Sequence, residues 1–159
     1  NAATGIDISG GIMGASVNAS MNTDFDGNEM TSYGLSYAVN DDMSVTVGMT
    51  SYGDDNGFSM AGTDMSGADW SNGQMAYLEG NQEMLSYGLT YNLGGVSLGA
   101  SMNTVTDNDE DKADYERNVM MLDLGYDLSN NASLGLRYAT DEDGTSDSKY
   151  TWVTLTVTP

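Results

Sequence analysis

Large apolar side chains alternate with small or polar ones along much of this chain, most clearly in residues 87–102. Tyr87, Leu89, Tyr91 and Leu93 are separated by Gly, Thr and Asn, and the pattern continues beyond a Gly-Gly pair. Because successive side chains of a strand point to opposite faces, a period of two predicts one apolar and one polar face. The polar positions hold mainly Ser, Thr, Gly and Asn, which suits a water-filled interior better than a soluble surface rich in Lys and Glu.

The alternation restarts nine times and predicts nine strands. We expect them at residues 3–9, 12–23, 30–39, 43–52, 84–93, 96–105, 117–128, 132–140 and 149–158. Short connections with hairpin-turn chemistry alternate with longer acidic ones. The short ones are Gly10-Gly11, Asn40-Asp41-Asp42, Gly94-Gly95 and Ser129-Asn130-Asn131, and the longer ones are 24–29, 53–83, 106–116 and 141–148. Short turns at one end and long loops at the other predict an all-β, antiparallel up-and-down sheet.

Five charged residues, four well inside predicted strands and one at a first residue, fall on the polar face: Asp7, Arg117, Asp123, Asp127 and Arg137. The exceptions sit at strand edges: Glu83 just before one strand and Lys149 at the start of another. Three apolar residues also fall there and break the pattern: Met84, Met121 and Trp152. The apolar face carries tyrosines that match the aromatic girdles of membrane barrels: Tyr33, Tyr37, Tyr87, Tyr91, Tyr126 and Tyr138. A soluble sandwich would also have one apolar face, but its outer face usually carries abundant charge, whereas the charges here gather in the loops. We therefore expect a transmembrane β-barrel rather than a soluble sandwich.

The charge balance and the missing residue types exclude several functions. The 159 residues include 24 acidic and 4 basic residues, no His and no Cys, for a formal net charge of -20. Nucleic-acid binding needs a basic surface, whereas disulfides, thiol nucleophiles and zinc–thiolate sites need Cys. The longest apolar runs, such as Val119–Leu122, are far shorter than the ~20 residues of a transmembrane helix.

Together these patterns resemble the C-terminal part of a Gram-negative outer-membrane porin of the general diffusion family. The resemblance rests on strands of about ten residues, tight turns, Asp- and Asn-rich loops, and Tyr-Gly-Leu-Ser/Thr-Tyr starts at Tyr33 and Tyr87. It covers residues 30–52, 84–105 and 117–158. The family implies a multi-pass outer-membrane barrel of about sixteen strands, often trimeric, through which small hydrophilic solutes diffuse passively. Residues 1–159 would then be the C-terminal part of one barrel domain, with 53–83 as a long external loop.

Three features qualify this resemblance. The chain ends in Leu155–Pro159, where such barrels usually end in an aromatic residue. The predicted wall has Arg117 and Arg137 as its basic residues, so a strongly anion-selective constriction is not supported. If Gly10-Gly11 is a short turn, the first strand starts at the long-loop end. Because bacterial barrels have an even number of strands, we expect at least one strand before Asn1.

The polar faces hold the candidate functional residues. As a pore lining, their hydroxyls and mixed charges would let a hydrated solute pass without tight binding, and selectivity would come from pore width and wall charge. Because wall carboxylates and acidic mouths raise the local cation concentration, we expect a mild cation preference. The predicted lining residues are Asp7, Ser36, Ser44, Thr46, Thr90, Ser97, Ser101, Arg117, Asp123, Asp127 and Arg137.

Metal and catalytic sites have weaker support. Asp107, Asp109 and Asp111 alternate loosely like calcium-loop ligands, but the central Gly and distal Glu of an EF-hand are missing, so a solvated loop is the simpler interpretation. Asp123 and Asp127 lie roughly 13 Å apart on one strand, beyond the ~5–9.5 Å that glycoside hydrolysis requires. We expect no catalysis and no cofactor.

The long connection and the partners leave alternatives open. Segment 53–83 is either a mobile external loop, or a segment that uses Trp70 as an anchor to fold inward or to cap the neighbouring subunit. Expected partners are outer-membrane lipid and lipopolysaccharide, further copies in a homotrimer, small hydrophilic solutes, and phage or other surface binders at the loops. The second hypothesis is an interaction protein: a non-conducting surface barrel acting as receptor or adhesin, or a soluble acidic β-domain of a surface layer.

Overall fold

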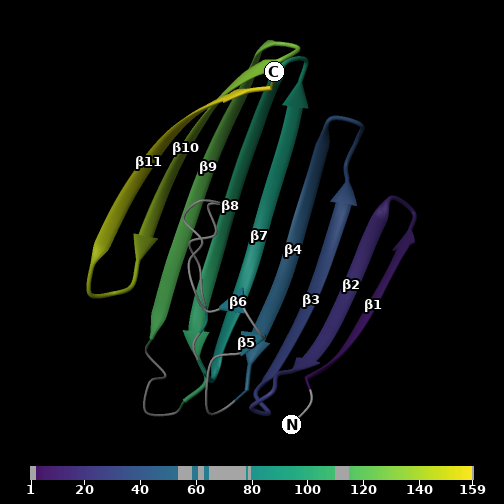
Figure 1. Ribbon diagram of the computed structural model, residues 1–159, viewed down its shortest axis with the longest axis vertical. Helices are drawn as coiled ribbons and strands as arrows, with labels where there is room; N and C mark the ends of the chain where they lie inside the picture. Colours follow the sequence, from purple (N-terminus) through teal and green to yellow (C-terminus); the bar gives the residue numbers. More distant parts are fainter. Residues whose placement is uncertain are drawn as a thin grey trace.

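The computed structural model is a single curved wall of antiparallel strands (Figure 1). It describes residues 3–53, 59–60, 63–64, 78, 80–109 and 115–158. Nine strands form one sheet in the order β1-β2-β3-β4-β7-β8-β9-β10-β11, so each long strand pairs with the next long strand along the chain. Their bounds are β1 Thr4–Ile12, β2 Ala15–Thr23, β3 Glu29–Ala38, β4 Met43–Tyr52, β7 Gln82–Leu93, β8 Val96–Asp107, β9 Glu116–Ser129, β10 Ala132–Glu142 and β11 Asp147–Val157. The predicted all-β up-and-down sheet of nine strands is confirmed.

The two ends of the wall differ as the connection lengths predict. The short turns after β1, β3, β7 and β9 lie at the top of Figure 1, together with the C-terminus, and the connections β2–β3 and β10–β11 lie at the bottom, where β4 and β8 end and β7 and β9 begin. We call these the short-turn end and the long-loop end. A second sheet of two short strands, β5 Ser59–Met60 and β6 Thr63–Asp64, falls inside the long connection and was not predicted. Trp70 lies outside the described residues.

The first turn is not where the sequence placed it. Gly10 and Gly11 continue β1, where they pair with Val17 and Ser16, and the chain reverses at Met13-Gly14. Both turn residues have positive φ angles, 51° and 81°, as the type I′ turn of a tight hairpin requires. The prediction of a Gly10-Gly11 turn was therefore wrong.

The physical reason is the register of the hairpin. Cross-strand partners share a face of the sheet. A two-residue turn at Gly10-Gly11 would set Ile12 opposite Ser9 and mix the two faces, because one slipped position exchanges them. The observed turn instead pairs Ile12 with Ala15 and Ile8 with Ala19.

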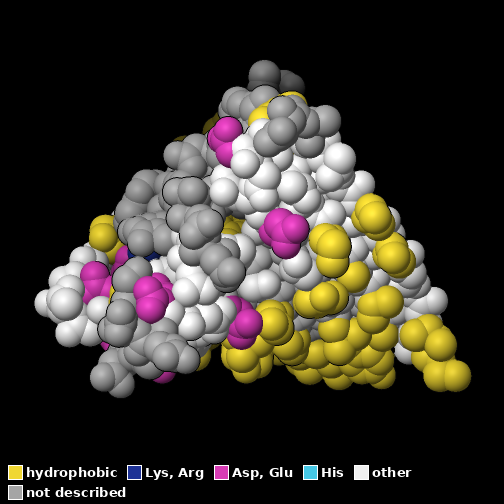
Figure 2. All heavy atoms as spheres, turned by 90° about the horizontal axis from the view of Figure 1, so that it is seen from below, with side chains coloured by type: hydrophobic (Ala, Val, Ile, Leu, Met, Phe, Trp, Pro, Cys, Tyr) yellow, Lys and Arg dark blue, Asp and Glu magenta, His cyan; other side chains and the backbone are white. Residues whose placement is uncertain are grey.

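The two faces stay separate along the middle and the short-turn end of the sheet, whereas near the long-loop end the apolar face holds polar residues such as Thr104 and Asn118. One apolar row runs through Leu98, Leu124 and Leu136, and the next row on the other face runs through Ser97, Gly125 and Gly135. The large apolar residues of the first face are about half exposed, and nearly every long strand carries some of them. In Figure 2 they gather as a band along the lower right margin, seen from the long-loop end. We call this the apolar face, and its opposite the polar face. Among the described residues, no helix is long and apolar enough to cross a membrane.

The described core lies on the polar face, near the long-loop end. One cluster joins buried Tyr52, Leu78 and Val105 with Met30, Met84 and Tyr115 around them. A second joins Val119 and Ala139 with Met121, Tyr150 and Trp152. The apolar residues that break the sequence pattern belong to these clusters, so the exceptions have a packing role. Leu78 comes from the long connection, so this residue at least packs inward against the wall.

Candidate functional site

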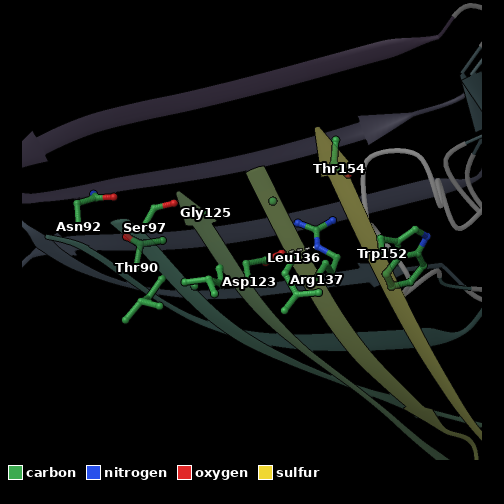
Figure 3. Close-up of a pocket in the computed structure, with 13 residues that line it drawn as sticks. Thr90, Asn92, Ser97, Asp123, Gly125, Leu136, Arg137, Trp152 and Thr154 are labelled. Carbon is green, nitrogen blue, oxygen red and sulfur yellow. Dashed lines mark hydrogen bonds and ion pairs between the residues drawn. The ribbon is translucent and has the colours of Figure 1, made fainter. Parts of the chain in front are cut away.

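The polar face of β7 to β11 is hollowed into a concavity of about 720 Å³ (Figure 3). Thr90 and Asn92 of β7 and Ser97 of β8 border one side, and Trp152 and Thr154 of β11 border the other. The hollow shows that the wall curves toward its polar face. The apolar face is therefore the outer, convex one.

Glycines make this curvature possible. On a concave face, side chains of neighbouring strands converge, so a residue without a side chain leaves room for its neighbour. A Cβ atom added at Gly125 would collide with the Ser97 hydroxyl, and one added at Gly88 would collide with the Thr46 hydroxyl. Gly10, on the convex face, has nothing within 4 Å of the same position.

An ion pair crosses the floor of the concavity. The Arg137 Nε atom of β10 donates to the Asp123 Oδ1 atom of β9 at 2.5 Å, and the two residues are direct cross-strand partners. Their side chains are 30% and 38% exposed, so water screens the pair. An exposed pair of this kind contributes only about 0–1 kcal/mol to the stability of the fold. Its main effect is therefore on the local charge of the wall.

A second ion pair is buried toward the long-loop end. Arg117 of β9 donates to both carboxylate oxygens of Asp141 of β10, at 2.8 Å from Nε and 2.6 Å from Nη2. The side chains are 7% and 13% exposed. This two-pronged geometry satisfies the carboxylate and fixes the guanidinium plane. The sequence identified Arg117 but not its partner, because Asp141 had been assigned to a loop rather than to β10.

The remaining predicted lining residues lie on the polar face but do not converge on one point. They are spread over six strands: Asp7 on β1, Ser36 on β3, Ser44 and Thr46 on β4, Thr90 on β7, Ser97 and Ser101 on β8, and Asp127 on β9. Ser44 and Thr90 share a hydrogen bond of 2.6 Å across β4 and β7. The polar residues therefore coat a wall rather than assemble one catalytic centre.

The sequence did not predict two kinds of contact between side chains. On the polar face, the hydroxyls of Ser20 and Ser32 join β2 and β3 at 2.8 Å. The Thr104 hydroxyl donates to the Asn118 amide oxygen at 2.8 Å across β8 and β9, on the apolar face near the long-loop end. Tyr150 and Trp152 stack on β11 with ring centroids 5.7 Å apart and planes at 23°. The period-two spacing of these two aromatic residues could have indicated a shared face.

The predicted girdle tyrosines lie on the apolar face. Tyr33, Tyr87 and Tyr126 are about half exposed there, and Tyr37, Tyr91 and Tyr138 share their parity. Their contact with a membrane interface stays a prediction.

The calcium candidates are partly described. Asp107 is buried, its Oδ1 atom accepts the Asp109 N–H at 3.0 Å, and its Oδ2 atom faces the Gln82 amide at 3.4 Å. Asp111 lies outside the described residues. Within the described ranges, no group of three or more potential metal ligands occurs.

One carboxylate at the long-loop end has a perturbed pKa. Hydrogen bonds from the Thr145 hydroxyl and from the backbone N–H groups of Thr145 and Ser146 lower the pKa of Asp143 to about 2. These bonds close the turn between β10 and β11 and hold the charged Asp143 carboxylate at the rim of the wall.

Comparison with known proteins agrees with this architecture. A family model described as Gram-negative porin matches residues 2–158, which is nearly the whole chain. Searches of the curated proteins and of the solved structures found no match. The family implies a porin-type channel in the outer membrane rather than an enzyme. The chain, whose sheet and resemblance had both indicated a porin, therefore belongs to the Gram-negative porin family.

Proposed function

We propose that the polar face lines a water-filled channel through which small hydrophilic solutes and ions diffuse passively, with a mild preference for cations. The observation that carries the proposal is the hollowed polar face backed by a face that is apolar along its middle and toward the short-turn end. A membrane wall with this arrangement exposes its apolar side to lipid and its concave side to water. The interior of such a wall can be coated with small polar side chains because they meet solvent rather than lipid.

We infer that this wall of nine strands is part of a larger closed barrel of about sixteen strands. The sheet is open, with β1 and β11 at its edges, and both edge strands run from the long-loop end to the short-turn end. Unpaired backbone groups at such an edge cost several kcal/mol each in lipid. Because β1 and β11 run in the same direction, an odd number of further strands between them is needed for every pair of neighbouring strands to be antiparallel. About seven further strands would meet this condition and give a barrel of about sixteen strands.

The charge of the wall supports the cation preference. Both arginines of the polar face are neutralised by aspartates, because Arg117 pairs with Asp141 and Arg137 pairs with Asp123. Asp7 and Asp127 have no cationic partner in the described part of the chain. The wall therefore carries net negative charge, which raises the local concentration of cations within about 8 Å at physiological salt.

A salt gradient across a planar bilayer tests both parts of the proposal. The full-length protein should conduct, and the reversal potential in a potassium chloride gradient should have the sign of a cation-preferring pore. Asp127→Asn should move the potential toward zero, because the unpaired wall charge is removed. Asp26→Asn, a matched change in an exposed turn outside the strands, should move it less.

Two results would count against the proposal. An anion-preferring sign would refute the selectivity. Absence of conductance from protein that has inserted into the bilayer would refute the channel and favour the non-conducting receptor or adhesin. The homotrimer and the contacts with lipopolysaccharide and surface binders stay predictions.

A further inference from the structure

Three side chains form a row across the hollow of the polar face. Asp123, Arg137 and Trp152 are successive cross-strand partners on β9, β10 and β11. All three border the concavity, and Figure 3 shows them side by side over the ribbon. An indole ring here is unusual, because most other positions of the polar face hold Ser, Thr, Gly, Asn or Asp.

Trp152 is held in a defined orientation. It stacks on Tyr150, with ring centroids 5.7 Å apart, and packs beside the buried pair Val119 and Ala139. It nevertheless stays partly exposed at the border of the hollow. A ring fixed in this way loses little conformational entropy when a ligand stacks against it, because its rotamer is already set.

The floor and the rim suit a small polar ring. Gly99, Gly125 and Gly135 leave backbone as the floor around the ion pair, and the Thr90 and Thr154 hydroxyls stand on opposite sides. The volume of about 720 Å³ falls within the roughly 300–1,000 Å³ of small-molecule sites. A channel wall that only lets ions pass does not need an aromatic ring beside hydroxyl groups.

We propose that this hollow is a binding site for saccharides on the channel wall. A pyranose ring has an apolar C–H face that stacks on an indole, and hydroxyls at its edge that hydrogen-bond to threonines and to charged groups. The facing charges of Asp123 and Arg137 neutralise each other locally, so a neutral solute is favoured over an ion. The inference rests on the proposed channel, because a solute reaches this face through its water.

Conductance of single channels tests the site with cellobiose, whose β-linked rings present axial C–H groups on flat faces. Cellobiose should reduce the current in a saturable way, and sorbitol, an acyclic polyol, should reduce it only through viscosity. Trp152→Leu keeps apolar volume against Val119 and Ala139 but removes the ring, and should weaken the apparent affinity roughly two- to ten-fold. Trp152→Phe keeps a ring and should retain most of the affinity.

A second readout does not depend on the Leu variant folding. In a background where Trp70 and any tryptophan outside residues 1–159 are replaced by Phe, Trp152 is the remaining tryptophan, so cellobiose should shift its fluorescence and sorbitol should not. If channels conduct but neither current nor fluorescence responds to cellobiose, or if sorbitol acts equally, the saccharide site is refuted and the channel stands. An equal response of Trp152→Leu and the unaltered protein in the current assay also refutes it. Absence of conductance refutes the channel itself.

Discussion

An arginine placed on either face of one strand measures which face meets lipid. Leu89 and Thr90 are neighbours near the middle of β7, both side chains are exposed, and they point to opposite faces. Leu89 is 42% exposed and lies between Val45 and Ala100 on the apolar face. In a membrane wall this exposed surface contacts lipid, whereas that of Thr90 contacts water.

The free-energy cost of each arginine substitution depends on how deep the residue lies in the bilayer. At ~3.3 Å per residue, Leu89 lies roughly 13 Å along the strand from the end of β7 at Leu93 and roughly 23 Å from its start at Gln82. Leu89→Arg should therefore cost about 2–4 kcal/mol of unfolding free energy, a shift of roughly 30- to 1,000-fold in the folding equilibrium. Thr90→Arg loses the hydrogen bond to Ser44 and should cost about 0.5–1.5 kcal/mol.

Urea unfolding in lipid vesicles, followed by tryptophan fluorescence, measures these differences. Leu93→Arg separates lipid from protein packing, because it lies at the strand end, where a charge costs only about 0–1 kcal/mol in a bilayer. A face packed against protein would show no such dependence on depth. Equal costs for Leu89→Arg and Thr90→Arg would refute the assignment of the faces.

Other positions give independent expectations. Gly88→Ala on the concave face should destabilise by about 1 kcal/mol because the new methyl forces the Thr46 hydroxyl to turn away, whereas Gly10→Ala on the convex face should be tolerated; denaturant midpoints compare them. Arg117→Ala breaks a buried ion pair and should cost about 3–5 kcal/mol, against about 0–1 kcal/mol for the exposed pair of Arg137→Ala, and similar losses would contradict the burial argument. Because the folded pKa of Asp143 is depressed, its contribution to stability is present above about pH 4 and is lost as the pH falls toward 2; carboxyl NMR titration should give a midpoint near 2, and an ordinary midpoint near 4 would contradict the turn hydrogen bonds.

The alternation was sufficient to predict the nine long strands and their two faces, since parity depends only on neighbouring residues. It could not place the first turn, because Met13 adopts a positive φ angle that its side chain does not indicate. The position of this turn is set by the register of the hairpin. The alternation also could not predict how side chains pack on the polar face. Leu78 reaches Tyr52 and Val105 from a long connection without periodicity.

The partner of each arginine depended on strand register rather than on sequence spacing. Arg137 meets Asp123 because β9 and β10 align these rows, and the rows could be counted only once the turn was fixed. The hollow beside them arises from glycines on three neighbouring strands. Each glycine alone had looked like an ordinary small residue of the polar face.

Cysteine accessibility along β7 tests most directly whether the polar face lines the channel. Residues 1–159 contain no Cys, so once any Cys elsewhere in the full-length protein is replaced, single substitutions report without background. Thr90→Cys should react with a charged, membrane-impermeant thiol reagent during bilayer recording, and the single-channel current should change in a step. Leu89→Cys should neither react nor change the current. Reaction at both positions, or reaction at Thr90→Cys with no change in current, would contradict a water-filled channel lined by the polar face.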